Sequence, residues 1–319
     1  MDKKLKYDLN TEMRLDKYLS DYFPDISRTK IQKNIHQGAI LVDGYFVKPS
    51  YRLKTNHIVS IEDFNLDKDR TLLKPQNIPL NIIYEDDQIV VVNKSSGIVV
   101  HPGIGNKDST MLNALLYHCA SLSNFSNRPG VIHRLDKETT GVIVFAKTDK
   151  AHYFISEQFA NREVLKQYKA IVWGNLNEEQ LIEKYLKRDD RNRLRFKTSD
   201  NTGKKSITIC KPYRNHSIPI SIVDAYPETG RTHQIRVHLS SIGHPILNDV
   251  LYNGSDKNIN SFHEKDRKSL LNIIKLINRV ALHAYKIQFK HPTLSKTVSF
   301  EAPIPDDFKN IYTKLDEYK

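Results

Sequence analysis

The chain has 319 residues, which is long enough for one large domain and one small domain, each with its own apolar core. Its 49 Lys and Arg residues exceed its 37 Asp and Glu residues, and the resulting formal charge of +12 favours a polyanionic partner. Two distant cysteines without C-x-x-C spacing argue against a disulfide framework and a zinc site. The sequence shows no signal peptide and no membrane-spanning apolar run, so we expect a cytoplasmic protein.

Residues 1–64 predict a small α/β domain. Apolar residues at helical spacing predict a helix over 14–23, and a second helix is expected over 27–35. An Asp-Gly pair at 43–44 predicts a tight turn within a hairpin over 39–47. The order is therefore two helices followed by strands.

Basic residues dominate this first domain. Residues 26–61 contain six Lys and Arg residues and only one acid, Asp43. The second predicted helix carries Arg28, Lys30 and Lys33 on its basic face. The arrangement resembles the S4 RNA-binding module, and the resemblance implies that these three residues contact RNA.

A polar stretch over 65–78 is expected to be a linker to a second domain over 79–319. This second domain opens with two apolar runs around an acidic turn, which predicts a hairpin over 82–94. Short strands then alternate with a few helices, without the regular β-α-β rhythm of a parallel sheet. Residues 253–278 look like an insertion that ends in a helix over 270–277.

One stretch, residues 130–147, is too specific to be scaffold alone. Asp136 lies in a polar turn between two β-branched apolar runs that predict strands, with Arg134 two residues before it and Gly141 five residues after it. Such a turn can hold a single nucleophile at the end of a strand. The stretch resembles the H-R-L-D-x-x-T-S/T-G signature of the RluA family of RNA pseudouridine synthases.

Four further stretches resemble the same family in the same order. They are Asn93–Pro102, Lys166–Ala170, Thr229–Leu239 and Leu282–Pro292. The chain departs from the family pattern at Ser95, where proline is usual, and at Asn248, where glycine is usual. The resemblance covers nearly the whole chain and implies an α+β fold with a mixed, largely antiparallel sheet.

The resemblance implies isomerisation of uridine to pseudouridine. This reaction changes no oxidation state and adds no group, so neither a metal nor a cofactor is expected. One carboxylate must attack the ribose or assist the departure of uracil, and Asp136 is the predicted residue. The family places the arginine of T-G-R-T-H-Q, here Arg231, beside that carboxylate. Without the motif, Asp136 would be taken for an ordinary turn acid.

Further roles follow from the resemblance. Tyr168 is expected to stack on the uracil, or to act as a base at C5. Arg134 is expected to fill the space left by a flipped-out base. Leu282 would either form an apolar wall beside the base or serve as an ordinary core leucine, and His233 would orient a backbone or phosphate oxygen.

Several charged groups have simpler explanations. His233 and His238 are expected on a β-strand, where a spacing of five residues would point them to opposite faces and exclude a shared metal. Glu138 is expected to be a solvated turn charge rather than a second catalytic acid. Residues 184–205 contain nine basic residues and three acids, which predicts either a phosphate-binding hairpin or a solvated tip.

The predicted function is pseudouridine formation in large-subunit (23S) ribosomal RNA, the usual substrate of family members with this domain order. Two alternatives stay open: a non-catalytic RNA-binding or ribosome-assembly factor on the same fold, and a synthase that acts on transfer RNA. No protein partner is implied, and we expect a monomer.

Overall fold

A computed structural model describes residues 3–9, 11–23, 26, 28–62, 73–103, 105–124 and 128–318. The chain divides into two compact units. Unit 1 is Met1–Leu73 with Ser126–Arg128, and unit 2 is Lys74–Phe125 with Pro129–Lys319. Among the described residues, no helix is long and apolar enough to cross a membrane.

Unit 1 packs two short helices against a small sheet. Its elements are β1 (Lys3–Lys6), β2 (Met13–Arg14), α1 (Leu15–Tyr22), α2 (Arg28–His36), β3 (Ile40–Val42), β4 (Arg52–Leu53) and β5 (Ile58–Ile61). The strands β1, β5 and β3 form an antiparallel sheet in that order, and β2 pairs with β4. Leu15, Leu19, Ile31 and Ile35 are fully buried, so the apolar stripes of both helices form its core.

The structure confirms both helices expected in unit 1, and the Asp-Gly turn. Asp43 and Gly44 have φ values of 50° and 81°, as a tight turn requires, and the Asp43 carboxylate accepts the Ile58 backbone N–H at 2.7 Å. The predicted hairpin is wrong in its second strand, because β3 pairs along its length with β5 rather than with residues 45–47. Ser27, at the expected start of the second helix, lies outside the described residues.

Unit 2 contains the remaining elements. The strands are β6 (Ile82–Glu85), β7 (Ile89–Lys94), β8 (Thr140–Ala146), β9 (Leu165–Trp173), β10 (Gln180–Arg188), β11 (Phe196–Ser199), β12 (Lys204–Asn215), β13 (Ile220–Pro227), β14 (Leu282–Lys290) and β15 (Thr297–Glu301). The α-helices are α3 (Met111–His118), α4 (Asp149–Ala160), α5 (Gln234–Ser241), α6 (Glu264–Ile274) and α7 (Asp306–Leu315), and the 3-10 helices are η1 (Val250–Tyr252), η2 (Asp256–Ser261) and η3 (Asp316–Tyr318).

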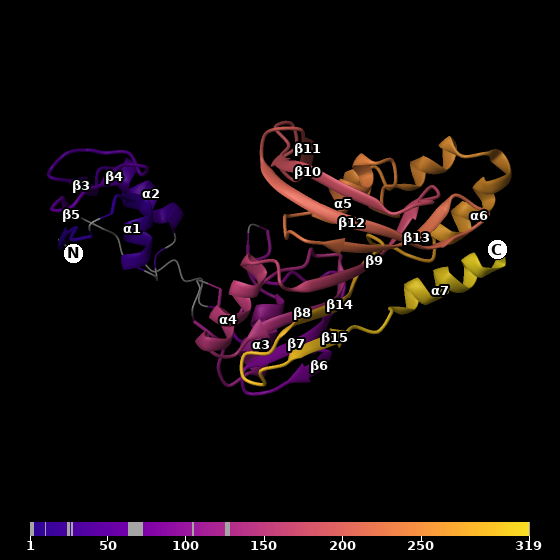
Figure 1. The fold of residues 1–319 in the computed structure, drawn as a ribbon, viewed down its shortest axis with the longest axis horizontal. Helices are drawn as coiled ribbons and strands as arrows, with labels where there is room; N and C mark the ends of the chain where they lie inside the picture. Colours follow the sequence, from indigo (N-terminus) through magenta and orange to yellow (C-terminus); the bar gives the residue numbers. More distant parts are fainter. Residues whose placement is uncertain are drawn as a thin grey trace. The chain divides into compact units, whose positions relative to one another are not determined.

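These ten strands form one sheet (Figure 1). Its order is β11-β10-β12-β13-β9-β14-β8-β7-β6, with β15 also paired to β14. The pairs are antiparallel except for β14 with β8, which run parallel with Ala284 opposite Gly141. The α+β class and the mixed, largely antiparallel sheet are therefore confirmed.

The middle of the sheet carries the largest core. Every residue of β8 is buried, as are the last five residues of β9. Trp173 of β9 stacks on Phe262 at 5.5 Å between ring centroids, and Phe308 and Ile311 of α7 are fully buried in the same cluster. A continuous apolar core thus supports the strands in the middle of the sheet.

Three predicted elements of unit 2 differ in the structure. The apolar run before Asp136 makes only an isolated bridge, from Val131 to Phe145, rather than a strand. Residues 234–241 form the helix α5 rather than a strand. The helix of the 253–278 segment, α6, begins at Glu264 and ends at Ile274, because Leu270, Ile273 and Ile274 supply its buried face. The hairpin of β6 and β7 is confirmed.

The last residues of the stretch expected to be a linker pack on unit 2. The Gln76 backbone N–H donates to the Asn113 carbonyl oxygen at 3.0 Å, and the Asn113 side chain donates to the Lys74 carbonyl oxygen at 2.9 Å. Residues 63–72 lie outside the described residues.

Candidate active site

Asp136 lies in the turn that leads into β8. Leu135, just before it, is buried and anchors the turn, and the Thr139 backbone N–H donates to the Asp136 carbonyl oxygen at 3.2 Å. The Asp136 side chain keeps 20% of its surface exposed. A rigid backbone therefore presents a carboxylate that a ligand can still reach.

Lys94, the last residue of β7, stabilises this turn through hydrogen bonds to its backbone. It is 1% exposed, and its ammonium donates to the carbonyl oxygens of Ser95, Lys137 and Thr139, each at 2.9 Å. Burial lowers the pKa of Lys94 to about 7, against the opposing charge of Asp136. Sequence reasoning assigned Lys94 no role, although it belongs to a family motif.

The cation beside Asp136 is Arg236 of α5. Its Nη1 lies 3.3 Å from Asp136 Oδ2. Its Nε and Nη2 donate to the two oxygens of the buried Asp249 at 2.7 and 2.8 Å. Burial alone would lower the pKa of Arg236, but the two carboxylates outweigh it and raise the pKa. Asp249 thus fixes the guanidinium that faces Asp136.

This geometry corrects the expected role of Arg231. The Arg231 side chain is exposed, and its Nε donates to the Lys205 carbonyl oxygen at 3.4 Å. The cause is the helix. His233, with a φ of 56°, is the N-cap residue of α5, so His233 and Arg236, three residues apart, lie on one side of it. Arg231 precedes this helix and is not brought to Asp136.

His233 completes the polar surroundings of the carboxylate. Its Nε2 lies 3.9 Å from Asp136 Oδ2, and its Nδ1 lies 2.8 Å from the Tyr252 hydroxyl. Burial lowers the pKa of His233 despite the nearby Asp136, which favours the neutral imidazole. The Tyr252 ring lies 5.0 Å from the guanidinium carbon of Arg236, so it also packs on the cation.

Four residues of this arrangement were missed as functional by sequence reasoning: Lys94, Arg236, Asp249 and Tyr252. The available signal was a charged residue, Arg236, between the apolar Ile235 and Val237. It points to a buried ion pair only once the segment is known to be a helix.

Tyr168 and Leu282 lie on neighbouring strands. Tyr168 of β9 is partly buried against the main core, and burial, reinforced by the charge of Asp136, raises the pKa of its phenol. Leu282 of β14 is 3% exposed, pairs with Ala170 and belongs to that core. Its position favours the core role over a wall that contacts the base.

Arg134 is exposed, whereas His133, the residue before it, is held by contacts within the protein. His133 accepts the Val144 backbone N–H at 3.1 Å and stacks on Phe159 with 4.9 Å between ring centroids. Burial lowers the pKa of His133 to about 3, so this ring is neutral and structural. Glu138 accepts the Val280 backbone N–H at 3.3 Å, so this acid is a hydrogen-bonded turn residue.

In unit 1, the basic helix face is partly neutralised. Arg28 donates to the fully buried Asp16 at 2.9 and 3.1 Å, and Arg14 and Gln32 donate to the same carboxylate. Burial favours a higher pKa for Asp16, but these hydrogen bonds hold it at about 2. Lys30 and Lys33 lie on the same helix, and Lys33 is exposed. A hollow in unit 1 is lined by residues that include Gln32, His36 and Lys48.

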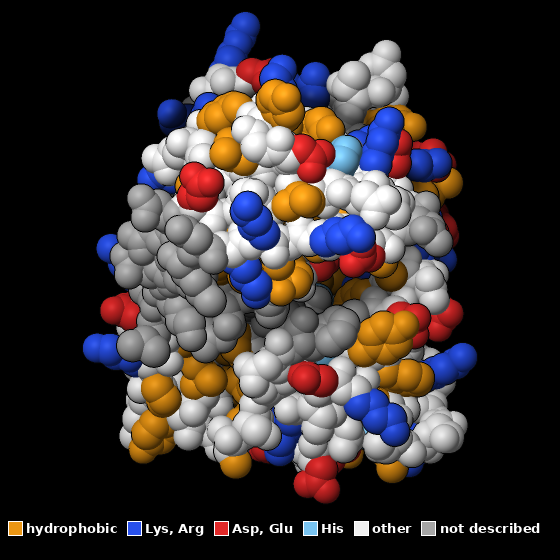
Figure 2. Space-filling view, turned by 90° about the vertical axis from the view of Figure 1, so that its left-hand side faces the viewer, with side chains coloured by type: hydrophobic (Ala, Val, Ile, Leu, Met, Phe, Trp, Pro, Cys, Tyr) orange, Lys and Arg blue, Asp and Glu red, His pale blue; other side chains and the backbone are white. Residues whose placement is uncertain are grey.

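The basic hairpin of β10 and β11 reaches the candidate site through Phe196, the first residue after its loop. The Phe196 backbone N–H donates to the Tyr252 hydroxyl at 2.9 Å, and the Phe196 ring lies 6.0 Å from the His233 ring. Its tip carries Arg191 and Arg193 exposed. Figure 2 shows Lys and Arg side chains spread among acidic ones over one face of the molecule, so the positive charge there forms no single patch.

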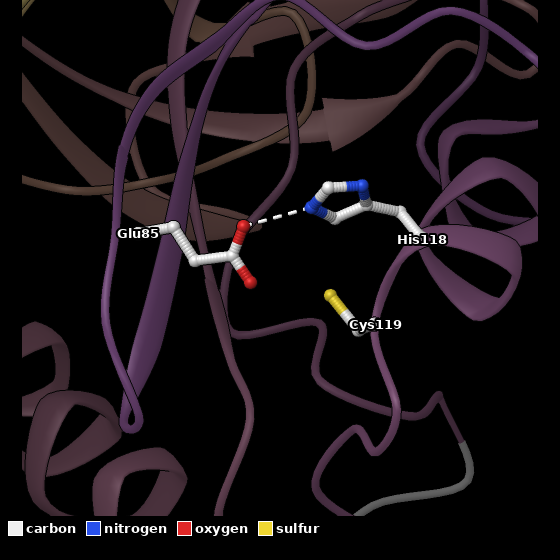
Figure 3. A group of neighbouring side chains, drawn as sticks. All are labelled: Glu85, His118 and Cys119. Carbon is white, nitrogen blue, oxygen red and sulfur yellow. Dashed lines mark hydrogen bonds and ion pairs between the residues drawn. The ribbon is translucent and has the colours of Figure 1, made fainter.

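One group of side chains has the donor types of a metal site. Glu85, His118 and Cys119 place one ligand atom each within 4.8 Å of one another (Figure 3). The Glu85 carboxylate already accepts from Lys147 at 2.8 Å and lies 2.7 Å from His118 Nε2. Burial raises the pKa of the Cys119 thiol to about 11, so it is protonated. The group lies near the end of β8 away from Asp136 and forms no part of this site.

Comparison with known proteins identifies the class. A family model described as RNA pseudouridylate synthase matches residues 88–241, and the S4 domain model matches residues 13–59. A protein of Aquifex aeolicus named as an uncharacterized RNA pseudouridine synthase is 40% identical over 96% of this chain and 95% of its own. The chain therefore belongs to the RNA pseudouridine synthase family, with an S4 domain at its N-terminal side, as the motifs predict.

Other relatives are more specifically named. The ribosomal large subunit pseudouridine synthase D of Xylella fastidiosa is 38% identical over 95% of this chain and 89% of its own. Among solved structures, human RNA pseudouridylate synthase domain containing 1 is 26% identical, with a TM-score of 0.54 over 72% of this chain and 85% of its own.

Proposed function

We propose that this protein isomerises uridine to pseudouridine in large-subunit ribosomal RNA, with Asp136 as the nucleophile. The observation that carries the proposal is a partly exposed Asp136 carboxylate 3.3 Å from Arg236, whose guanidinium is fixed by Asp249. In a chain of this family, that arrangement would hold the Asp136 carboxylate in a fixed position for reaction with the ribose.

The reaction needs one bond broken and one formed. The bond between ribose C1′ and uracil N1 breaks, and a bond between C1′ and uracil C5 forms, after which the proton on C5 is lost. Asp136 would attack C1′ or stabilise the positive charge that develops on the ribose when uracil leaves, as the carboxylate of a retaining glycosidase does. C5 gives up its proton to solvent and N1 takes one up, so the composition of the nucleotide is unchanged, and the proposed chemistry uses only side chains.

The surroundings suggest separate roles for the neighbours. The Arg236 guanidinium, 3.3 Å from Asp136 Oδ2, attracts the Asp136 carboxylate and orients it. A phenol with a raised pKa is a poor base, so Tyr168 is better suited to stack on the uracil than to remove the C5 proton. The exposed Arg134 would occupy the stack that the flipped base leaves, offsetting part of an unstacking cost of a few kcal/mol.

The choice of substrate rests on the relatives and on domain order. Several relatives that match almost the whole chain are named for the large ribosomal subunit, and unit 1 matches an S4 domain. The proposal includes a cytoplasmic enzyme that acts as a monomer, because ribosomal RNA is the proposed partner and no protein partner is implied.

The test uses purified protein and a large-subunit ribosomal RNA transcript labelled with tritium at uracil C5. Wild type should release tritium, and carbodiimide mapping should locate the new pseudouridines. Asp136→Asn should release none while it still binds the transcript. Glu138→Gln, a matched change two residues away, should retain activity. Full activity of Asp136→Asn would remove Asp136 as nucleophile, and activity on transfer RNA alone would change the substrate.

A further inference from the structure

Lys166 is a partly buried lysine on the strand that carries Tyr168. It precedes Tyr168 by two residues on β9, so both side chains point to the same face of the sheet, with Cα atoms about 7 Å apart. Its ammonium lies 5.8 Å from the centroid of the Phe159 ring. Among the described residues, no carboxylate lies within ion-pair distance of this ammonium.

Other buried lysines of the same sheet are satisfied inside the protein. Lys169, on the opposite face of β9, bonds Asp224 at 2.7 Å, and Lys94 donates to three carbonyl oxygens. Within the part of the chain that the structure describes, Lys166 has the Phe159 ring near its ammonium and no ion pair. Burial lowers its pKa to about 8, and the more distant Glu228 only partly opposes this. A half-desolvated cation without an anion is unfavourable by itself, and an incoming anion would relieve that cost.

The neighbours of Lys166 place it on the substrate side. The Phe159 ring beneath its ammonium stacks on His133, and His133 directly precedes Arg134. His133 is in turn fixed by the Val144 backbone N–H. Lys166 therefore lies beside a pair of stacked rings, of which His133 directly precedes Arg134 in the chain, and Tyr168 lies two residues further along β9.

We propose that Lys166 binds a backbone phosphate of the RNA next to the target uridine. The inference rests on the proposed function, in which uracil stacks on Tyr168 and ribose meets Asp136. The phosphate of the same or the adjacent nucleotide then falls within reach of Lys166. The ammonium donates charge-assisted hydrogen bonds to the non-bridging phosphate oxygens and positions the nucleotide without touching the reacting atoms.

The experiment compares Lys166→Gln with Lys211→Gln. Lys211 on β12 lies opposite Asp224, on the other face of the sheet from Tyr168, and pairs with Glu179 at 3.0 Å, so its loss removes the same charge elsewhere. Binding of the large-subunit ribosomal RNA transcript is measured across a KCl series. Removing one phosphate contact should reduce the slope of log K against log[KCl] by about 0.7 to 0.9 and weaken binding about 5- to 10-fold at 0.1 M KCl.

Lys166→Gln should show this reduced slope, Lys166→Arg should restore the wild-type slope, and Lys211→Gln should match wild type. The RNA concentration that gives half-maximal tritium release should rise for Lys166→Gln and stay at the wild-type value for Lys211→Gln. An unchanged slope for Lys166→Gln would overturn the inference, because it means that the ammonium contacts no phosphate. Failure of the proposed function appears separately, as absence of tritium release from wild type.

Discussion

The candidate site depends on one guanidinium that two carboxylates share. Asp249 takes two of the donors of Arg236 and is itself fully buried, so the third donor points at Asp136. A planar guanidinium with several N–H donors can bond both carboxylates at once, whereas the donors of a lysine ammonium have no fixed arrangement. The position of Asp136 is therefore controlled from a residue 100 positions away in the chain.

Arg236→Lys should consequently lower kcat by about 10²- to 10³-fold, the range seen when one electrostatic donor is lost from an active site. Lysine keeps the charge but cannot bond Asp249 at both oxygens and reach Asp136 as well. Tritium release at saturating RNA measures the effect. Arg231→Gln serves as the control and should keep nearly full kcat, since Arg231 bonds a carbonyl oxygen of β12. If Arg231→Gln lowered kcat more than Arg236→Lys, then Arg231 rather than Arg236 would be the cation that acts with Asp136.

The difference between Arg231 and Arg236 also shows what sequence reasoning can reach. Asp136 and Tyr168 lie in short motifs whose local pattern predicts a turn and a strand, and the structure has both. Residues 234–241 alternate polar and apolar side chains, which is the pattern of a strand. They form a helix because tertiary contacts override this sequence pattern. Gln234 bonds Thr229, Ile207 and Thr208, and His233 adopts a left-handed backbone conformation. Such long-range contacts have no local signature.

At the scale of elements, the contact that places Asp136 beside β9 is the parallel pairing of β8 with β14. The strands approach so closely at Gly141 that an added Cβ would lie 2.1 Å from the Ala284 carbonyl oxygen. Gly141 also has a φ of 114°, which other residues rarely adopt. The sequence motif contains this glycine, but the strand it must approach lies 143 residues further on and cannot be inferred from the motif.

Gly141→Ala should therefore destabilise the protein by about 3 kcal/mol or more, because backbone strain and a steric clash with a neighbouring strand add together. Gly243→Ala is the matched control. Gly243 also has a positive φ, 82°, but open space around it, so only the strain of about 1 kcal/mol applies. Urea unfolding of both variants measures the difference. Equal destabilisation of the two variants would mean that β8 and β14 can move apart to accept the added methyl group without loss of stability.

At the scale of the whole molecule, the chain is built from two units with separate cores. The core of unit 1 consists of residues between Leu5 and Ile61, and the cluster around Trp173 lies entirely in unit 2. The composition and the break in pattern before residue 79 indicate two parts, but the boundary is less easily predicted. Lys74 and Gln76 look like linker residues, yet they bond Asn113, because Asn113 also caps α3 and offers its remaining polar groups.

A chain that begins at Lys74 should consequently fold and retain the wild-type kcat, because Asp136, Arg236 and Tyr168 all belong to unit 2. Its affinity for ribosomal RNA should fall, with the salt slope reduced by about 0.7 to 0.9 for each phosphate contact that unit 1 makes. Circular dichroism checks the fold, and tritium release over a range of RNA concentrations separates kcat from KM. Asp136→Asn in the shortened chain supplies the blank. If kcat at saturating RNA were lost while the shortened chain stayed folded, unit 1 would contribute to the chemistry as well as to binding, and the separation of roles proposed for the two units would fail.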